Sequence, residues 1–233
     1  MNILITGANR GLGLAITAEA CARGYQVLAG VRSPGSSVEG LQTLSNKFPE
    51  QITVLPLDVT DENSVRYAYD QVSIQMSSLD AVINNAAILL GREQKLEQLD
   101  FDQVEQSFQT NLFGPMIVLK YFLAMLQKGE RQAVVNISSE AGSFAGAYGG
   151  DYSYALSKAA LNMFSAQLRR ELAPHGILVH ALHPGWIRTD MGGGEAPGEA
   201  AASAEGILDI IERRTEAENQ ALFIDHNGKP MSI

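Results

Sequence analysis

A tyrosine and a lysine four residues apart are the side chains of this sequence best suited to proton transfer. Tyr154 and Lys158 lie in a segment of helical period, which places both on one face of a predicted helix. Because a nearby ammonium favours the phenolate, we expect Lys158 to lower the pKa of Tyr154 from its reference value of about 10 toward the working pH. A phenol tuned in this way can act as a general acid or base. The alternative is an ordinary exposed pair on a helix.

A glycine-rich turn near the start of the chain is suited to binding a pyrophosphate. The string Thr6-Gly7-Ala8-Asn9-Arg10-Gly11-Leu12-Gly13 follows the apolar segment Ile3–Ile5 and precedes a run of helical period. Glycines let the backbone turn sharply and approach a phosphate, and the helix N-terminus offers unpaired N–H groups. The spacing alone is weak evidence, since a chain with 22 Gly contains it about 0.2 times by chance. Its position between a predicted strand and a predicted helix makes it specific.

The end of the second apolar segment indicates which dinucleotide is bound. An NAD-binding protein usually has a carboxylate here for the ribose 2′-hydroxyl. This segment ends Ala29-Gly30-Val31-Arg32, without an acid. Arg32 and Arg10 could instead bind a 2′-phosphate by forked, charge-assisted hydrogen bonds, so NADP(H) is favoured over NAD(H). The alternative is that both arginines are solvated surface residues.

Short apolar segments alternate with longer segments of helical period along the chain. They are Ile3–Ile5, Val27–Ala29, Ile52–Leu55, Ala81–Ile83, Ala133–Ile137, Ile177–Leu182 and Ala221–Ile224. Most are unbroken by polar residues, as is typical of parallel strands covered on both faces. The pattern predicts an α/β fold in a single domain, residues 1–233. We expect a doubly wound (Rossmann), mainly parallel seven-stranded sheet with helices on both faces.

Several boundaries of the predicted elements can be read from the sequence. Asp61 is a plausible N-cap, and Pro174-His175-Gly176 ends a helix that runs from about Tyr154 to Ala173. The segment 184–204 is rich in Gly, Pro and Ala and includes Gly192-Gly193-Gly194. We interpret 184–204 as a mobile loop that forms a substrate lid.

Composition and charge narrow the class of protein. The formal charge of −9 repels phosphate backbones and anionic lipid, which argues against a nucleic-acid or membrane partner. No stretch is long and apolar enough for a membrane-spanning helix, and the N-terminus lacks the features of a signal peptide. Cys21 has no disulfide partner, and the histidines lack metal-ligand spacing, so no metal site is expected. We expect a cytoplasmic enzyme acting on a small molecule.

Taken together, these motifs resemble the short-chain dehydrogenase/reductase family over nearly the whole chain. In the family's order the chain has the glycine motif, Asp58-Val59, Asn84-Asn85-Ala86-Ala87, Asn111, Ser138-Ser139, Tyr154 with Lys158, and Pro184-Gly185. The segments 184–191 and 225–230 are further similar to the branch of bacterial C-factor-like and animal sniffer-like carbonyl reductases.

The resemblance implies roles for particular residues. Tyr154 would protonate the substrate carbonyl oxygen as hydride arrives from the nicotinamide, Lys158 would lower the Tyr154 pKa and hold the ribose, and Ser139 would hold the substrate oxygen. Asp58 and Val59 are expected near the adenine, and Asn85-Ala86 on the adenosine side. The residues expected at the cofactor are Gly7, Asn9, Arg10, Gly11, Leu12, Gly13, Arg32, Asp58, Val59, Asn85, Ala86, Tyr154, Lys158, Pro184, Gly185, Ile187 and Thr189.

Asn111 has a distinctive neighbour. In a regular helix its carbonyl would accept a hydrogen bond from residue 115, but Pro115 has no N–H. The family uses a main-chain carbonyl at this position to hold a water linked to the active-site lysine, and we hypothesise that Gly114-Pro115 enforces such an opening here. The alternative is a simple packing kink.

Two features depart from the family's pattern. Ala87 stands where the family often has glycine, which narrows the backbone freedom beside the cofactor. The separation of Ser139 and Tyr154 is about two residues longer than is typical of the family, which suggests an insertion around Ala147–Gly150 that reshapes the substrate mouth.

The leading hypothesis is therefore an NADPH-dependent reductase of a ketone or an aldehyde. The alternatives are an NAD-linked alcohol dehydrogenase and a dinucleotide-sensing regulatory or signalling protein with little turnover. An intact Ser139, Tyr154 and Lys158 argues against a mere sensor. By resemblance, the long helices around Phe101–Gln127 and Tyr154–Ala173 would form the interfaces of a homodimer or homotetramer.

Overall fold

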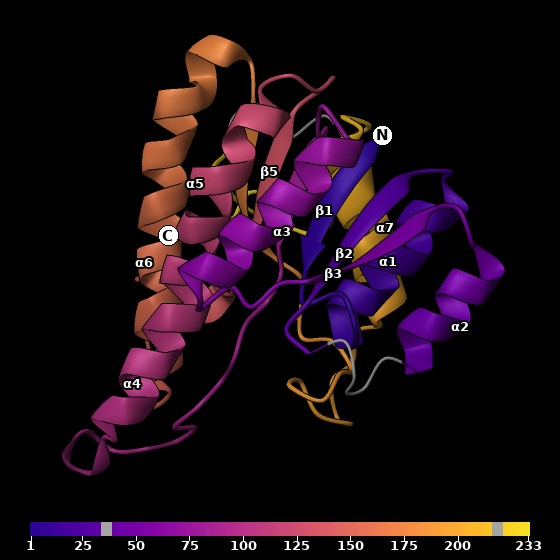
Figure 1. Ribbon diagram of the computed structural model, residues 1–233. Helices are drawn as coiled ribbons and strands as arrows, with labels where there is room; N and C mark the ends of the chain where they lie inside the picture. The colour runs from indigo at the N-terminus through magenta and orange to yellow at the C-terminus, as the bar shows by residue number, and fades with distance from the viewer. Residues whose placement is uncertain (34–38, 216–220) are drawn as a thin grey trace.

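The protein folds around one parallel sheet. The computed structural model describes residues 1–33, 39–215 and 221–233. Within them the strands are ordered β3-β2-β1-β4-β5-β6-β7, and every neighbouring pair is parallel (Figure 1). The strands are β1 (Asn2–Thr6), β2 (Gln26–Val31), β3 (Ile52–Pro56), β4 (Ala81–Asn84), β5 (Ala133–Ile137), β6 (Leu178–His183) and β7 (Phe223–Asp225). The predicted seven-stranded, doubly wound sheet is confirmed.

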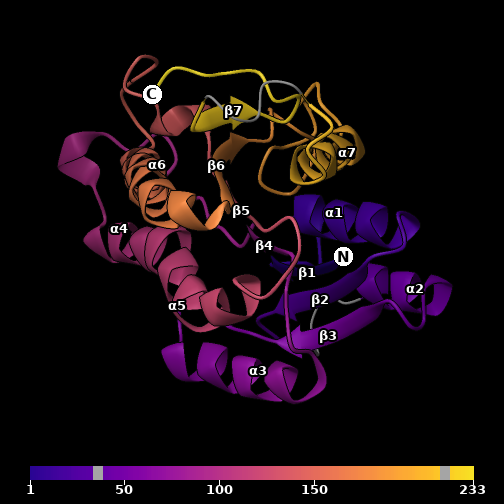
Figure 2. The same cartoon turned by 90° about the horizontal axis from the view of Figure 1, so that it is seen from above.

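Helices cover both faces of the sheet (Figure 2). They are α1 (Gly11–Ala22), α2 (Glu39–Lys47), α3 (Glu62–Gln75), α4 (Phe101–Phe108), α5 (Gly114–Leu126), α6 (Tyr152–Leu172) and α7 (Ala200–Ile211). One apolar cluster joins α1, α2 and α7 to one face, and a second joins α3, α5 and α6 to the other. In β1, Ile3 and Ile5 belong to the first cluster and Leu4 to the second, which explains the unbroken apolar segment.

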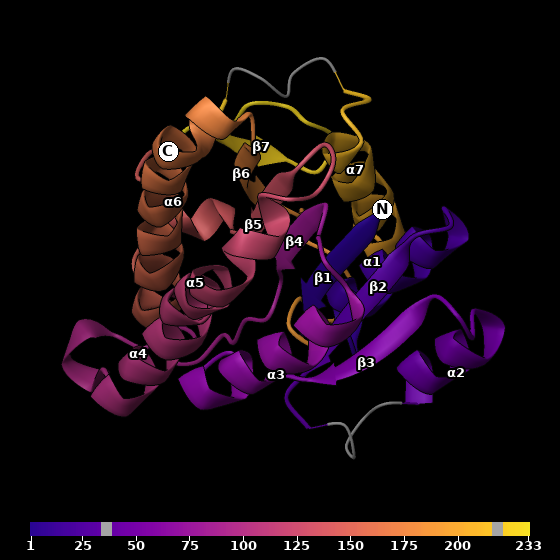
Figure 3. The same ribbon diagram turned by 45° about the horizontal axis from the view of Figure 1, so that its top comes forward.

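The strand order creates a crevice at the carboxyl end of β1. The chain passes from β1 through β2 to β3 on one side and then returns to β4 on the other side of β1. In open parallel sheets, ligands bind where the order reverses in this way, outside the carboxyl ends of the strands. Figure 3 shows β1 and β4 side by side at this point. The fold therefore directs the loops after β1 and β4 to one site.

The predicted helix boundaries are largely met. The Asp61 carboxylate accepts a hydrogen bond from the Asn63 N–H over 2.9 Å, as an N-cap should. Helix α6 begins two residues earlier than expected, at Tyr152, and passes into the 3₁₀-helix η4 (Ala173–His175) before Gly176 adopts a φ of +70°. A glycine with positive φ is a common end of a helix.

The predicted lid is shorter than expected. Its last five residues, 200–204, form the first turns of α7, so the loop after β6 covers only residues 184–199. The base of this loop is closed by backbone hydrogen bonds between Arg188 and Gly198, at 2.9 Å, and between Gly198 and Trp186, at 3.0 Å. In the sequence the small residues of 200–204 look like loop, but alanine also favours a helix. Here "lid loop" denotes residues 184–199.

Candidate active site

The residues expected to do chemistry gather at the carboxyl ends of the central strands. The glycine turn follows β1, Asn85 follows β4, Ser139 follows β5 and Pro184 follows β6. In Figure 1 the lid loop crosses below the end toward which β1 points. Helix α6 brings Tyr154 and Lys158 to the same end, because it packs on β6 and on the 3₁₀-helix η3 (Glu140–Gly142) that follows Ser139.

Tyr154, Lys158 and Ser139 form one contact group. The Ser139 hydroxyl lies near enough to the Tyr154 phenol to lower its pKa, and the Lys158 Nζ lies 5.6 Å from the centroid of the Tyr154 ring. The Lys158 ammonium donates to the carbonyl oxygen of Ile137 at the end of β5, over 2.7 Å. Lys158 is 2 % exposed and Tyr154 is half-buried. The spacing of four residues thus places the Tyr154 phenol and the Lys158 amine close together, near the Ser139 hydroxyl that follows β5.

The electrostatics differ from the expectation drawn from the spacing. Burial raises the pKa of the Tyr154 phenol above its usual value, and the Ser139 hydrogen bond and the charge of Arg92 only oppose that rise. Burial also lowers the pKa of the Lys158 ammonium to about 7. The Tyr154 phenol therefore does not have the net lowered pKa that the spacing predicted, while the effect of Lys158 on it stays a prediction. Desolvation disfavours both charged forms, and it weakens the cation that was expected to stabilise the phenolate.

The structure distinguishes the two adjacent serines. Ser138 is buried and donates from Oγ to the Asn162 Oδ1 over 2.6 Å, so its hydroxyl belongs to the interior. Ser139 is only half-buried, and its Oγ accepts the Ala141 N–H over 3.2 Å. Because that lone pair is used, the Ser139 hydroxyl hydrogen is available to an oxygen at the site.

Helix α6 approaches the loop after β5 very closely. An added Cβ on Gly142 would lie 2.7 Å from the Lys158 carbonyl carbon, so only glycine permits this contact. Asn162, one turn after Lys158, donates to the Gly142 carbonyl over 3.2 Å. Sequence reasoning missed both residues. Asn162 could have been found from its spacing. It follows Lys158 by four residues, as Lys158 follows Tyr154, so all three residues share one helix face.

Asn111 lies in an irregular part of its helix. Residues Gln109–Phe113 form a π-helix, η2, in which the Gly114 N–H donates to the Gln109 carbonyl. Single π-turns of this kind often occur at functional sites. The Asn111 side chain is buried: Oδ1 accepts the Ile88 N–H at 2.9 Å, and Nδ2 donates to the Ile88 carbonyl at 2.9 Å and to Ser157 Oγ at 3.0 Å. The Asn111 side chain thus joins the loop after β4 to α6. The role of the Asn111 main-chain carbonyl stays a prediction.

The glycine turn has the shape that a dinucleotide phosphate requires. Gly7 and Gly11 have φ of +66° and +52°, and an added Cβ on Gly13 would lie 2.2 Å from the Gly7 carbonyl oxygen. The N-cap residue Arg10 makes no side-chain cap to α1, so the N–H groups of the first turn have no capping side chain. Asn85 Nδ2 donates to the Thr6 and Gly7 carbonyls at 2.9 and 3.2 Å. These residues fit a nicotinamide dinucleotide.

The two candidate arginines have different surroundings. Arg32 is exposed just after β2. Arg10 forms an ion pair with Asp190 of the lid loop at 3.0 Å, although both side chains are well exposed, at 66 % and 77 %. Next to this pair, Thr189 lies against Gly11, whose added Cβ would be 3.4 Å from the Thr189 methyl. The lid loop is thus attached to the glycine turn.

The other expected cofactor residues line the same region. Asp58 accepts the backbone N–H and the hydroxyl of Thr60 at 3.0 and 2.7 Å, and Val59 is buried against Gly114. The Pro184 carbonyl accepts the Ser203 hydroxyl at 2.6 Å, and Ile187 is buried. Of the remaining ones, Asn9, Ala86 and Gly185 lie in the turns after β1, β4 and β6, and Leu12 is buried in the first turn of α1. No contact in the structure tests their roles.

Two residues at the site had not been expected from the sequence. Asp151 stands at the N-cap position of α6 with a φ of 49°, and its carboxylate accepts the Glu93 N–H at 2.9 Å instead of capping the helix. Arg92 donates to the Met191 carbonyl of the lid loop at 3.2 Å. Both contacts join segments far apart in the sequence, so no local pattern announces them.

The described residues lack two kinds of feature. No helix among them is long and apolar enough to cross a membrane. Within the same ranges, no three side chains of His, Cys, Asp or Glu are grouped so that they could hold a metal ion.

Comparison with known proteins places these features in context. Residues 1–200 match the sequence model of the family described as short chain dehydrogenase. C-signal of Myxococcus xanthus is 36 % identical over 151 residues, which cover 64 % of this chain and 90 % of that protein. The NADPH-bound carbonyl reductase from chicken fatty liver superposes with a TM-score of 0.90 at 34 % identity, covering 100 % of this chain and 98 % of that one. The carbonyl reductase Sniffer of D. melanogaster gives 0.91 at 29 % identity, covering 100 % and 99 %.

Gly13→Ala tests the shape of the glycine turn. The added methyl would collide with the Gly7 carbonyl, so the turn must shift. We expect a lower thermal midpoint and at least about 10-fold weaker binding of NADPH. Fluorescence titration measures the NADPH affinity. Gly146→Ala is the matched control, because its added Cβ meets nothing within 4 Å. Unchanged NADPH affinity in Gly13→Ala would contradict this description of the turn.

Lys158→Met tests the burial of the amine through the pH dependence of stability. The folded-state pKa of about 7 lies below the ordinary 10.5, so between these values the unfolded chain binds the extra proton. The free energy of unfolding of the wild type should therefore rise as pH increases from about 7 to about 10, and Lys158→Met should lose this part of the rise.

Urea unfolding at about pH 7, 8.5 and 10 measures the effect. Lys128→Met is the control, because the Lys128 side chain is exposed, and it should follow the wild type. If the profiles of Lys158→Met and the wild type run parallel, the amine is not held in its neutral form by burial.

Proposed function

The chain belongs to the short-chain dehydrogenase family, and on that premise we propose that it reduces a ketone or an aldehyde to an alcohol with NADPH. The family is one of NAD(P)-dependent oxidoreductases, and the similarity to C-signal and to Sniffer agrees with the branch expected from the sequence. Both the substrate class and the preference for NADPH belong to the proposal.

The observation that carries the proposal is the placement of the Tyr154 phenol beside Lys158, whose Nζ lies 5.6 Å from the Tyr154 ring centroid, and near the Ser139 hydroxyl, which acts on the Tyr154 pKa. Two hydroxyls placed near each other in this way can both reach one substrate oxygen, and one of them must give up a proton when a carbonyl becomes an alcohol. Bound NADPH supplies the hydride. Tyr154 supplies the proton from Oη, and Ser139 holds the carbonyl oxygen in place.

The raised pKa of Tyr154 favours the reductive direction. A general acid must be protonated before it reacts, and burial keeps this phenol in its neutral form at neutral pH. An alcohol dehydrogenase working oxidatively needs the phenolate instead, which burial disfavours. The alternative of an NAD-linked alcohol dehydrogenase therefore lacks support from the electrostatics of the chain.

Lys158 and Asn111 complete the proposed site. An ammonium has three donors, and Ile137 takes one of them, which leaves others for the ribose hydroxyls of the cofactor. A pKa of about 7 lets Lys158 give or take a proton near neutral pH. We retain the Asn111 carbonyl as a member of a proton relay that ends at Lys158, a role supported by the π-helix at Gln109–Phe113.

Preference for NADPH rests on the arginines and on the absence of an acid at the end of β2. Arg32 follows β2 directly and is exposed, so its guanidinium can fold onto a 2′-phosphate. Arg10 could join it by exchanging Asp190 for the phosphate. The chicken carbonyl reductase was solved with NADPH bound, which supports the same preference here.

Self-association through α4, α5 and α6 is also part of the proposal. Large apolar side chains are exposed there, including Phe101 at 71 % and Met163 at 61 %. Exposed apolar groups gathered on neighbouring helices favour a second copy of the chain as partner. Sedimentation equilibrium distinguishes the proposed dimer or tetramer from a single subunit.

Tyr154→Phe tests the proposed acid. Removing the phenol oxygen should reduce kcat with NADPH and a panel of ketones and aldehydes by about 10²–10⁴-fold, the usual contribution of a general acid. NADPH should still bind. Tyr67→Phe is the control, because Tyr67 is 62 % exposed on α3 and far from the site. Turnover of Tyr154→Phe within threefold of the wild type would refute the assignment.

Arg32→Ala tests the preference for NADPH. Loss of a charge-assisted contact to the 2′-phosphate should weaken NADPH binding by about 10-fold and leave NADH binding within twofold. Dissociation constants for both cofactors are measured by titration, with the exposed Arg170→Ala on α6 as control. Equal weakening of NADPH and NADH would mean that Arg32 does not contact the 2′-phosphate.

A further inference from the structure

The loop after β4 is held firmly at the mouth of the site. Asn111 binds both backbone groups of Ile88, the Ser153 hydroxyl donates to the Leu90 carbonyl at 2.6 Å, and the Asp151 carboxylate accepts the Glu93 N–H at 2.9 Å. These partners come from η2 and from the start of α6. Residues 88–93 are thus fixed against the helix that carries Tyr154.

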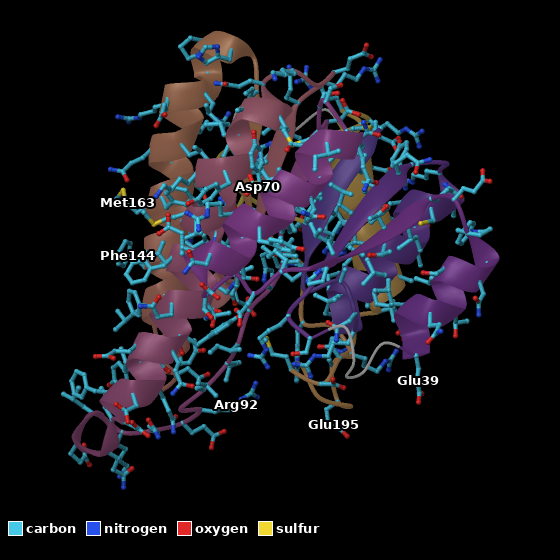
Figure 4. All side chains as sticks on the ribbon, in the orientation of Figure 1. Glu39, Asp70, Arg92, Phe144, Met163 and Glu195 are labelled. Atoms are coloured by element: carbon cyan, nitrogen blue, oxygen red, sulfur yellow. The ribbon has the colours of Figure 1, made fainter. Side chains whose placement is uncertain are left out.

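Arg92 projects from this fixed loop toward the lid loop. Figure 4 shows Arg92 at the lower end of the molecule, on the side of the lid loop that carries Glu195. Its Nη2 donates to the Met191 carbonyl at 3.2 Å. Its positive charge also reaches Tyr154, where it opposes the rise in the pKa of the phenol. Arg92 therefore contacts the lid loop and lies within electrostatic reach of the Tyr154 phenol.

Most donors of the Arg92 guanidinium are free for a ligand. A guanidinium has five N–H donors, and the contact to the neutral Met191 carbonyl uses one. In the described part of the chain, no carboxylate forms an ion pair with Arg92. The arginines of the glycine turn and the lid loop differ from Arg92 in this respect. Arg10 forms an ion pair with Asp190, and Arg188 forms one with Glu199.

Asp151, the acid that acts on Tyr154 together with Arg92, already has hydrogen-bond partners within the fold. The two Asp151 oxygens accept hydrogen bonds from the Glu93 N–H and from the Tyr148 hydroxyl, at 2.9 and 3.1 Å. Asp151 opposes Arg92 in its effect on Tyr154 but does not neutralise the guanidinium by contact. In a chain with a formal charge of −9, Arg92 is an unpaired positive group beside a phenol that donates a proton.

We propose that Arg92 determines substrate specificity by binding a carboxylate of the substrate, so that the preferred carbonyl compounds are oxo acids. The inference rests on the proposed function. Arginine binds a carboxylate through two parallel hydrogen bonds, which fixes the orientation of the bound molecule as well as its charge. A carboxylate held at Arg92 would orient the ketone or aldehyde carbon of the same molecule toward Tyr154 and Ser139.

The experiment compares acids with their uncharged esters. The pairs are benzoylformate, 3-oxobutanoate and 4-oxopentanoate, each with its methyl ester, assayed with NADPH. Within a pair the carbonyl is the same and only the charge differs. The wild type should prefer the acid in at least one pair. Arg92→Gln should lower the ratio of kcat/KM for that acid to kcat/KM for its ester by about 10-fold, mostly through KM.

Two further variants separate charge from structure. Arg92→Lys keeps the positive charge but lacks the two parallel N–H donors of the guanidinium. It should retain part of the preference for the acid over the ester. Arg66→Gln, on the exposed face of α3, should keep the wild-type ratio. Because Arg92 is exposed, the thermal midpoint of Arg92→Gln should match the wild type, which separates lost recognition from lost folding.

Equilibrium binding keeps the inference independent of turnover. Trp186 is the single tryptophan and lies on the lid loop, 56 % exposed, so its fluorescence reports on ligands there. We expect 3-hydroxybutanoate to bind the wild type, with NADP⁺ present, about 10-fold more tightly than it binds Arg92→Gln, and its methyl ester to bind both equally.

The outcomes distinguish the two proposals. If no carbonyl compound is reduced, the proposed function fails, and the binding titration still decides the role of Arg92. If ketones and aldehydes are reduced but the acid-to-ester ratio stays within twofold in Arg92→Gln, the carboxylate assignment is overturned and the reductase stands. If the wild type prefers the ester in every pair, the carboxylate assignment is overturned as well.

Discussion

The hydrogen bond from the buried Lys158 ammonium to the Ile137 carbonyl is the contact on which the site depends. It joins the end of β5 to α6 one turn after Tyr154, over 2.7 Å. Once this distance is fixed, Tyr154 must lie one turn earlier on α6 and Ser139 two residues after Ile137. The backbone that carries them therefore brings the phenol and the hydroxyl near each other, and neither lies on the lid loop.

Burying an amine at this point costs stability, and the surrounding fold must compensate for that cost. A cation without a carboxylate partner loses its hydration, which is why the pKa of Lys158 falls to about 7. Polar pairs hold the same interface: Asn136 donates to Ser165 at 2.8 Å, and Ser138 donates to Asn162 at 2.6 Å. These satisfied hydrogen bonds fix how α6 packs on β5. The helix therefore cannot shift to return the buried amine to water.

Around this fixed centre, two arginines from different segments contact the lid loop. Arg10 and Arg92 contact the lid loop from two sides, through Asp190 and through the Met191 carbonyl. Both contacts are exposed and individually weak, so a charged ligand can compete for either arginine. If both proposals hold, recognition of the cofactor and of the substrate involves the same lid loop, and Tyr154 and Lys158 lie on the helix α6.

The sequence by itself determined the seven strands, the glycine turn and the helix face shared by Tyr154 and Lys158. These follow from local rules: apolar segments such as Ile3–Ile5 are read by period, and a spacing of four residues fixes a helix face. The tertiary structure alone decided the raised pKa of Tyr154, the inward turn of Ser138 and the position of Arg92 beside the lid loop. Burial and contact between distant segments control these features, and neither is encoded in the spacing of neighbouring residues.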